Sequence, residues 1–191
     1  MDLDRCDAIV SQDSEPLILV DEVDRELGYL SKLRCHQGRG VLHRAFSILI
    51  FNSAGQLLLQ QRSTAKRLWP EFWSNSCCSH PRRGETLDDA AQRRLYEELG
   101  IRAPLRHLFK FQYHAQFDAN GAEHELCSVY LGVSDDTVRA NVNEISDWRW
   151  MFPAALQVEM QRADARFTPW FRTEWQRVWS EHRELIPHGF A

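Results

Sequence analysis

The sequence predicts an α+β fold, with a β-sheet flanked by helices, an N-terminal extension and C-terminal helices. Residues 87–99 carry apolar side chains at helical spacing between Thr86, a good N-cap, and Gly100, which suits a helix end. Residues 45–62 hold two apolar runs separated by N-S-A-G, and residues 106–133 hold two more separated by D-A-N-G. A helix between two hairpins indicates strands and helices in one domain.

The N-terminal part contains the first candidate site residues. Residues 1–16 are polar and are predicted to be a mobile lead-in. The run L-I-L-V-D-E-V at 17–23 predicts a strand, and residues 24–29 predict a turn. His36 and His43 follow, around two glycines. They converge if the chain curls between them; the alternative is two partly exposed loop histidines.

A basic cluster follows the first predicted hairpin. Residues 45–51 predict a buried strand, and residues 56–62 its returning partner. Arg62, Lys66 and Arg67 then lie in a polar loop. Such a cluster is commonly a solvated face. It is also where a phosphate-bearing substrate would need positive charge, because a Cys/His segment comes directly afterwards.

That segment, residues 69–86, is predicted to be a loop leading into the helix at 87–99. It carries Cys77, Cys78 and His80 between two tryptophans and a P-R-R-G turn. A thiol and an imidazole are thus placed close to the carboxylates of the helix. The alternative is an aromatic-anchored loop that caps an ordinary amphipathic helix, since short motifs are only hypotheses.

The second predicted hairpin pairs residues 106–117 with residues 125–133. Glu123 and Glu125 are two residues apart, so they point to one face if the returning strand begins early. Like charges side by side are unfavourable unless a positive group such as a metal ion lies between them. The alternative is a strand that begins at Leu126, with both acids in a solvated loop.

The C-terminal part predicts one more strand and two helices. Residues 144–152 predict the strand, with Trp148 and Trp150 on one face. Residues 153–162 and 169–183 predict helices, and we expect residues 153–191 to cover the site. There is no internal repeat or linker, so residues 1–191 are predicted to form a single domain.

Composition limits the classes of function. A net charge of −4 argues against nucleic acid as a partner, because phosphate contacts need a basic surface. No apolar run approaches the roughly 20 residues of a membrane span. The acidic N-terminus does not resemble a signal peptide. The five cysteines lack disulfide spacing. A cytoplasmic protein with reduced thiols is therefore predicted, while its oligomeric state stays open.

Two motifs carry a resemblance to known families. The segment S-x5-E-x7-R-R-L-Y-E-E-L-G, from Ser79 to Gly100, resembles the Nudix box G-x5-E-x7-R-E-U-x-E-E-x-G-U, with Ser79 and Arg94 as departures. The preceding N-S-x-C-x-H-P is similar to type I isopentenyl-diphosphate isomerases. The H-x6-H, C-x-H, E-x-E and F-T-P-W elements match that family in order across residues 17–180. The resemblance implies a Nudix-type mixed β-sheet core and isomerisation of isopentenyl diphosphate to dimethylallyl diphosphate in isoprenoid biosynthesis.

The resemblance also implies two cation sites. Its metal ligands match three imidazoles and two carboxylates: His36, His43, His80, Glu123 and Glu125. Five nitrogen and oxygen ligands suit a six-coordinate divalent ion better than tetrahedral structural zinc. In the family this ion is Mg²⁺, Mn²⁺ or Zn²⁺. A second Mg²⁺ would accompany the diphosphate, and Glu98 matches its protein ligand.

Further residues match the family's substrate and proton-transfer positions. Arg62, Lys66 and Arg94 match the residues that hold the diphosphate, for which the guanidinium fork is well suited. Cys78 and Glu125 match the acid/base pair on opposite sides of the alkene.

Two aromatic residues complete the implied site. Trp170 can stabilise a tertiary cation through its π face, and Tyr113 can orient or relay protons with Glu125. Which of Cys78 and Glu125 donates first is left open.

Two other functions compete with isomerisation. A Nudix hydrolase acting on a nucleoside diphosphate derivative needs the acid that Arg94 replaces. A non-enzymatic sensor or scaffold would be favoured by loss of Cys78 or Glu125, and both are present. Two departures from the family motif affect the site itself. Ser79 replaces a Nudix glycine, and Cys77 places a second thiol beside Cys78.

Overall fold

The computed structural model describes residues 7–119, 121–162 and 166–187. Its described strands form one nine-stranded sheet. The strands are β1 (Pro16–Val20), β2 (Glu26–Ser31), β3 (His43–Phe51), β4 (Leu57–Arg62), β5 (Trp73–Ser74), β6 (Cys77–Ser79), β7 (Leu105–Asp118), β8 (Gly121–Val133) and β9 (Ile145–Met151). The helices are α1 (Lys32–Cys35), α2 (Leu87–Leu99), α3 (Pro153–Met160), α4 (Pro169–Glu181) and a 3₁₀ turn (Arg183–Leu185).

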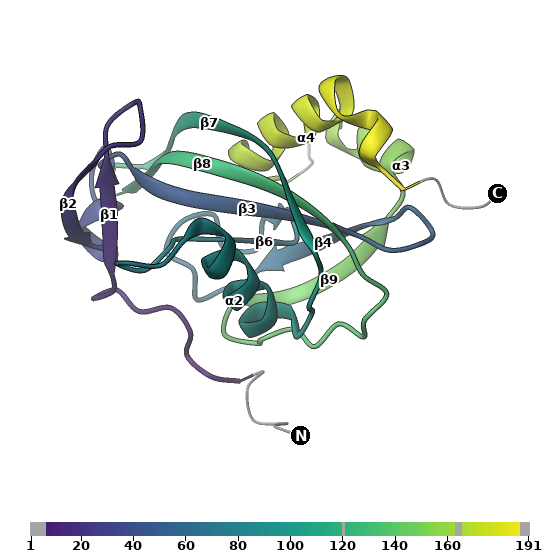
Figure 1. The fold of residues 1–191 in the computed structure, drawn as a ribbon, viewed down its shortest axis with the longest axis horizontal. Helices are drawn as coiled ribbons and strands as arrows, with labels where there is room; N and C mark the ends of the chain where they lie inside the picture. The colour runs from purple at the N-terminus through teal and green to yellow at the C-terminus, as the bar shows by residue number, and fades with distance from the viewer. Residues whose placement is uncertain (1–6, 120, 163–165, 188–191) are drawn as a thin grey trace.

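Helices cover both faces of the sheet (Figure 1). Side chains alternate between the faces along a strand, so β3 contributes to two separate cores. Phe46, Ile48 and Ile50 share one core with α2. Leu49 and Phe51 share the other core with α4. The predicted α+β fold is confirmed.

Parallel pairing of β3 with β8 makes the sheet a mixed one. The register runs from His43 opposite Glu125 to Phe51 opposite Val133. On its other side β3 pairs antiparallel with β6, and β8 pairs antiparallel with β7. Segments that are distant in the chain therefore lie side by side at the centre of the sheet.

Helix α2 agrees with its prediction at both ends. The Thr86 side chain accepts a hydrogen bond from the backbone N–H of Asp89 at 3.1 Å. Gly100 has a left-handed φ of 69°, and its N–H donates to the Tyr96 carbonyl. A side-chain cap at the start and a glycine at the end satisfy backbone groups that the helix leaves unpaired.

The prediction for residues 17–29 is partly wrong. Strand β1 ends at Val20, and the predicted turn at 24–29 is largely the strand β2, which pairs antiparallel with β1. The turn falls earlier because the Asp21 carboxylate accepts hydrogen bonds from the backbone N–H groups of Val23 and Arg25. The short helix α1 was not predicted.

The first hairpin and the Cys/His segment also differ from their predictions. Strands β3 and β4 are register partners only at Phe51 and Leu57. Beyond that point β4 pairs with β5 and β9, so the predicted hairpin separates after its turn. The segment 69–86, predicted to be a loop, contains β5 and β6. Cys78 therefore lies on a strand, opposite Ser47 of β3.

The second hairpin and the C-terminal elements agree with prediction. Strands β7 and β8 pair along their length, although the predicted D-A-N-G turn includes residue 120, which lies outside the described residues. Helices α3 and α4 end two residues earlier than predicted, at Met160 and Glu181.

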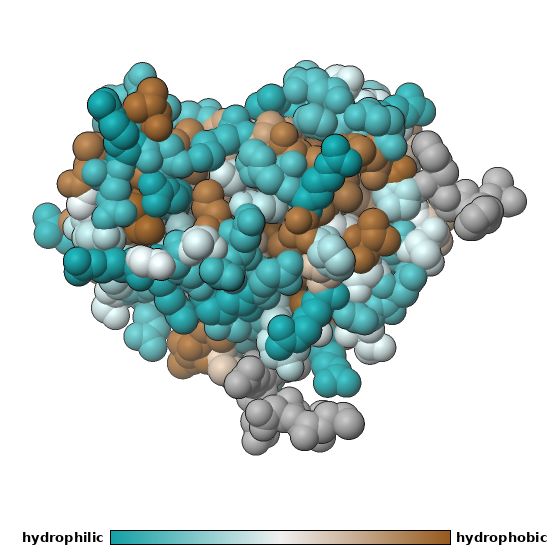
Figure 2. Space-filling view, in the orientation of Figure 1, coloured by the Kyte–Doolittle hydropathy of each residue, from teal (hydrophilic) through white to brown (hydrophobic). Residues whose placement is uncertain are grey.

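The surface of the protein is mostly polar on the face shown in Figure 2. Hydrophilic residues cover most of this face, with hydrophobic residues in small groups. Among the described helices, none is long and apolar enough to cross a membrane. The free cysteines in the described ranges are Cys35, Cys77, Cys78 and Cys127. Cys6 and the first part of the predicted mobile lead-in lie outside those ranges, so that prediction is not tested.

Candidate active site

Strand geometry gathers the predicted metal ligands. Glu123 and Glu125 both lie on β8, which begins at Gly121, so the expectation that they share one strand face is confirmed. Glu125 is the register partner of His43 on β3. His80 follows directly after β6, the strand on the other side of β3. Three neighbouring strands thus direct polar side chains to one place.

His36 joins this cluster because the chain curls after α1. Gly38 and Gly40 have left-handed φ values of 59° and 71°. At Gly40 a Cβ atom would lie 3.1 Å from the Ala122 carbonyl oxygen, so this close approach requires glycine. The His36 and His43 rings come to 4.9 Å between centroids. The predicted convergence of the two histidines is confirmed.

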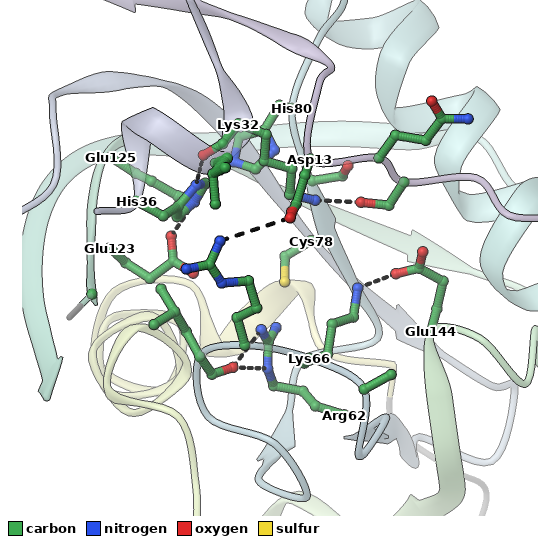
Figure 3. Close-up of a pocket in the computed structure, with 18 of the residues that line it drawn as sticks. Asp13, Lys32, His36, Arg62, Lys66, Cys78, His80, Glu123, Glu125 and Glu144 are labelled. Atoms are coloured by element: carbon green, nitrogen blue, oxygen red, sulfur yellow. Dashed lines mark hydrogen bonds and ion pairs between the residues drawn. The ribbon is translucent and has the colours of Figure 1, made fainter. Parts of the chain in front are cut away.

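The possible ligand atoms lie close together. One atom from each of His36, His43, His80 and Glu125 lies within 4.8 Å of the others. The Nε2 atoms of His43 and His80 are 3.1 Å apart, and Glu125 Oε1 is 3.1 Å from His80 Nε2. Glu123 Oε2 lies 2.8 Å from His36 Nε2. All five predicted ligands therefore converge, and Figure 3 shows four of them, His36, His80, Glu123 and Glu125.

The hydrogen bonds around two of the rings fit metal binding. His36 Nδ1 lies 2.7 Å from the Lys32 carbonyl, and His43 Nδ1 lies 2.7 Å from the Val41 carbonyl. A ring that donates from Nδ1 presents a free electron pair at Nε2, which here points into the cluster. Burial lowers the pKa of His80 to about 3, so its imidazole stays neutral. A neutral imidazole is a suitable metal ligand.

The carboxylates of the cluster also fit a cation. Burial would raise the pKa of Glu125, but the neighbouring imidazoles of His43 and His80 hold it well below its usual range. Glu123 Oε2 is buried and lies 2.8 Å from His36 Nε2. Burial would lower the pKa of His36, but Glu123 raises it, so this contact favours positive charge. The donor set suits a divalent metal ion.

Cys78, Tyr113 and Trp170 border the same cavity. Burial raises the pKa of Cys78 to about 12, so its thiol keeps the proton. Tyr113 Oη donates a hydrogen bond to Glu125 Oε2 at 2.7 Å. The Tyr113 and Trp170 rings are stacked with 6.0 Å between centroids, and Trp69 meets Trp170 edge-on at 5.3 Å. One end of the cavity is therefore an aromatic wall beside a thiol and a carboxylate.

Basic side chains line the rest of this cavity, which has a volume of about 360 Å³. Lys66 is paired with Glu144, and Arg62 donates to the carbonyls of Leu68 and Trp69. The Arg62 guanidinium also lies 5.2 Å from the centre of the Trp170 ring. Figure 3 shows Cys78 between the His/Glu cluster and these basic residues.

Arg94 and Glu98 form a buried pair. Arg94 contacts Glu98 and lies 3.6 Å from Glu144. Burial would lower the pKa of Arg94, but the two carboxylates raise it. Burial raises the pKa of Glu98, although Arg94 opposes the effect. Arg94 lines the cavity, whereas Glu98 is not one of its lining residues.

The structure adds cavity residues that sequence reasoning missed. Lys32 lines the cavity, and its ammonium donates to Ser11. Ser11 belongs to an N-terminal segment, residues 9–13, that also lines the cavity and accepts a hydrogen bond from Arg94 at the Val10 carbonyl. The position of Lys32, one helical turn before His36, could have indicated that it lines the cavity. The N-terminal segment contains no local motif that would have indicated its place.

The structure accommodates both departures from the family motif, Ser79 and Cys77. Ser79 lies in the strand β6, opposite Phe46, where the left-handed freedom of glycine is not required. Cys77 is fully buried in the core shared with α2, on the opposite face from Cys78. The two neighbouring thiols therefore point away from each other.

Comparison with known proteins identifies the class. The NUDIX domain model matches residues 41–171. The crystal structure of DR0079 from Deinococcus radiodurans matches with a TM-score of 0.70 and 26% identity, over 86% of this chain and 99% of that one. The MutT protein of Methanosarcina mazei matches with a TM-score of 0.63 at 18% identity, covering 74% and 96%, which shows the fold alone. The chain belongs to the NUDIX family.

Sequence relatives narrow the class further. A Burkholderia multivorans protein named isopentenyl-diphosphate Delta-isomerase is 44% identical over 164 residues, which cover 86% of this chain and 93% of the relative. A Serratia proteamaculans protein of the same name is 46% identical over 159 residues, covering 83% and 88%. Within the NUDIX family, the chain belongs with the isopentenyl-diphosphate Delta-isomerases.

Proposed function

We propose that this protein isomerises isopentenyl diphosphate to dimethylallyl diphosphate, a step of isoprenoid biosynthesis. The observation that carries the proposal is the arrangement of the 360 Å³ cavity. A thiol, Cys78, and a carboxylate, Glu125, border it beside the ring of Trp170. A double bond moves along an alkene when one group adds a proton to one carbon and another group removes a proton from a second carbon.

In this proposal Cys78 and Glu125 exchange protons with the substrate. Tyr113 Oη holds Glu125 through its 2.7 Å hydrogen bond and fixes the direction of that carboxylate. Protonation of the alkene produces a tertiary cation, which water would capture. Trp170, only 2% exposed, keeps water away from the cation and presents an aromatic surface to it.

Two metal sites belong to the proposal. Mg²⁺, Mn²⁺ or Zn²⁺ would be held by the three histidines and two glutamates of the cluster. When bound, this ion supplies positive charge that holds both carboxylates in place. A Mg²⁺ would accompany the diphosphate, with Glu98 as its protein ligand. For Glu98 to take that role, its contact with Arg94 must loosen, because the two now pair.

Lys66, Arg62 and Arg94 are proposed to hold the diphosphate, with Lys32 added by its place on the cavity wall. Lys66 and Arg94 are now paired with carboxylates. A diphosphate carries more negative charge than one carboxylate and offers more acceptor oxygens, so it can replace Glu144 as the partner of Lys66. We also infer that residues 1–191 act as a single domain in the cytoplasm, with residues 153–191 covering the site.

Hydrolysis of a nucleoside diphosphate derivative is the competing function. The MutT-type structures share the fold at 18–20% identity. At the central acid of the Nudix box, however, this chain has Arg94, whose guanidinium binds Glu98 and lines the cavity. Because Arg94 replaces an acid, it adds positive charge at this position and removes a metal ligand from it. The arrangement favours holding a diphosphate over hydrolysing it.

One experiment tests the proposed function directly. The purified protein is incubated with isopentenyl diphosphate in deuterated water, and the products are followed by NMR. Isomerisation gives dimethylallyl diphosphate that carries deuterium, because the added proton comes from an exchangeable group. Release of inorganic phosphate without deuterated product would instead support a hydrolase.

A further inference from the structure

One face of the sheet changes from polar to apolar along its strands, and Glu174 lies at the boundary. On β8 the residues facing α4 run from Glu125 through Cys127 to Val129. On β3, the matching series has Ser47 between His43 and Leu49. The metal cluster is at one end of each series and the hydrophobic core is at the other.

Ser47 and Cys127 occupy the boundary together with a carboxyl group from helix α4. Glu174 is fully buried there. Its Oε1 lies 3.9 Å from Cys127 Sγ, which is 3.5 Å from Ser47 Oγ. Its Oε2 has no hydrogen-bond partner in the described part of the chain. No described Lys or Arg forms a salt bridge with it.

This boundary adjoins the aromatic end of the proposed active site. Ser47 is the register partner of Cys78, so these two side chains stand side by side on the same face. Glu174 follows Trp170 by one helical turn, which places both on the same side of α4. Lys66 and Arg94 lie beside Glu144, whereas the Arg62 guanidinium lies 5.2 Å from the centre of the Trp170 ring. A diphosphate held by Lys66 and Arg94 would direct its hydrocarbon end toward Cys78 and Trp170.

Packing does not account for a carboxyl group in this place. A buried acid with an unpaired oxygen is unfavourable, and an apolar side chain of similar size would stabilise the core more. Burial raises the pKa of Glu174 to about 8, and the charge of Glu125 acts in the same direction. The titratable groups that face Glu174 are Cys127 and Glu125 on β8 and Cys78 on β6.

We propose that Glu174 is a positioning residue that acts by charge: its carboxylate, seated on Ser47 and Cys127 behind Cys78 and Trp170, stabilises positive charge at the hydrocarbon end of the substrate. The inference rests on the proposed isomerase function, whose reaction passes through a tertiary cation. A nearby positive charge favours the ionised form of a carboxyl group, so the substrate cation and the Glu174 carboxylate stabilise each other in this water-free setting. Because Glu174 does not line the cavity, it acts from behind the wall.

A matched pair of ligands tests this charge effect without turnover. The diphosphate of choline ends in a permanently positive trimethylammonium group, and its carbon isostere ends in a neutral tert-butyl group. Both are titrated by calorimetry at pH 9, above the pKa of about 8 of Glu174, into the metal-loaded wild-type protein and the Glu174→Gln variant. The variant keeps the shape of the side chain and removes its charge. Glu181→Gln, on the exposed end of the same helix, is the control.

We expect the variant to lose affinity for the cationic ligand only. Glu174→Gln should weaken binding of the cationic ligand by about tenfold, leave the neutral isostere unchanged, and lower kcat with KM unchanged. Equal affinities in both proteins for both ligands would overturn the inference. An equal loss for both ligands would show a structural role and would overturn it as well. If wild type selects the cationic ligand yet forms no dimethylallyl diphosphate, the proposed function fails while the charge effect stands.

Discussion

The Nε2 atoms of His43 and His80 lie only 3.1 Å apart in the buried interior of the sheet. Because His43 Nδ1 lies 2.7 Å from the Val41 carbonyl, the His43 ring presents an electron pair to its neighbour. Burial keeps His80 uncharged. Two electron-rich nitrogens at this distance repel each other unless a cation or a proton lies between them. A metal ion bound between the two rings would remove this repulsion.

Removal of the metal should lower the stability of the protein. A metal present at about a thousand times its dissociation constant contributes about 4 kcal/mol, which corresponds to roughly 10 °C in Tm for a chain of this size. Calorimetry with and without a chelator measures the shift. His36→Ala should reduce both the metal content and the shift, whereas His114→Ala, an exposed histidine on β7, should change neither. If Tm is unchanged after verified removal of the metal, the bound metal does not stabilise the protein and this prediction is wrong.

Lys66→Ala should raise KM for isopentenyl diphosphate with kcat nearly unchanged. The ammonium holds Glu144 in the free protein and, in our proposal, the diphosphate in the complex. Steady-state kinetics measures the effect, which we expect to be about tenfold or more. Arg25→Ala, an exposed residue paired with Asp21, is the control. Normal kinetics in Lys66→Ala would make this lysine only a structural partner of Glu144.

Arg62→Ala is a less informative variant than the sequence suggests. In a solvated cluster its loss would change stability by no more than about 0.5 kcal/mol. In the structure the guanidinium donates to the carbonyls of Leu68 and Trp69 and lies over Trp170. We expect the variant to lose about 1–3 kcal/mol of unfolding free energy, because those buried acceptors lose their donor. Chemical denaturation measures this loss.

Cys78→Ala should lower kcat by several orders of magnitude with little change in substrate affinity. The thiol is proposed to act on a proton, so its removal affects the transition state most. Cys77→Ala is the matched control, because Cys77 points into the opposite core and its loss should cost about 1 kcal/mol of stability while activity stays intact. Full activity in Cys78→Ala would rule out thiol chemistry in this reaction.

Glu174→Gln should change how stability depends on pH. The folded protein keeps the Glu174 proton up to about pH 8, whereas an exposed glutamic acid releases it near 4.5. Between these values unfolding releases a proton, so wild-type stability falls as pH rises, by about 1.4 kcal/mol per unit. The Glu174→Gln variant lacks this fall in stability, because glutamine does not titrate. It should match wild type near pH 4 and exceed it by a few kcal/mol at pH 8 in urea denaturation. A constant difference across that range would mean that Glu174 does not titrate as inferred.

The sequence predicted the parts of this site that have fixed local spacing. The H-x6-H, C-x-H and E-x-E motifs each set two side chains on one segment, and the α2 caps lie within a few residues of the helix. These features depend on local geometry, which a short pattern contains. The placement of His36, His43, His80, Glu123 and Glu125 together agrees with that prediction.

Other features depend on contacts between distant segments. Glu144 meets Lys66 and Arg94 only after β9 has paired with β4. The divergence of β3 and β4 results from competition between partners for their edges, which neither strand's own sequence reveals. Glu174 belongs to an otherwise ordinary amphipathic helix. Its burial against Ser47 and Cys127 results only from the packing of α4 on the sheet.

The parallel pairing of β3 and β8 sets the order in which a newly made chain can become functional. His43 emerges from the ribosome long before Glu125, its register partner. Long-range pairing of this kind is slow, because the intervening chain must be closed into a loop. During synthesis the histidines therefore exist without the carboxylates that complete their set. The five candidate ligands come together only after β8 has been released, so a ribosome stalled before residue 121 would hold a chain in which this ligand set is incomplete.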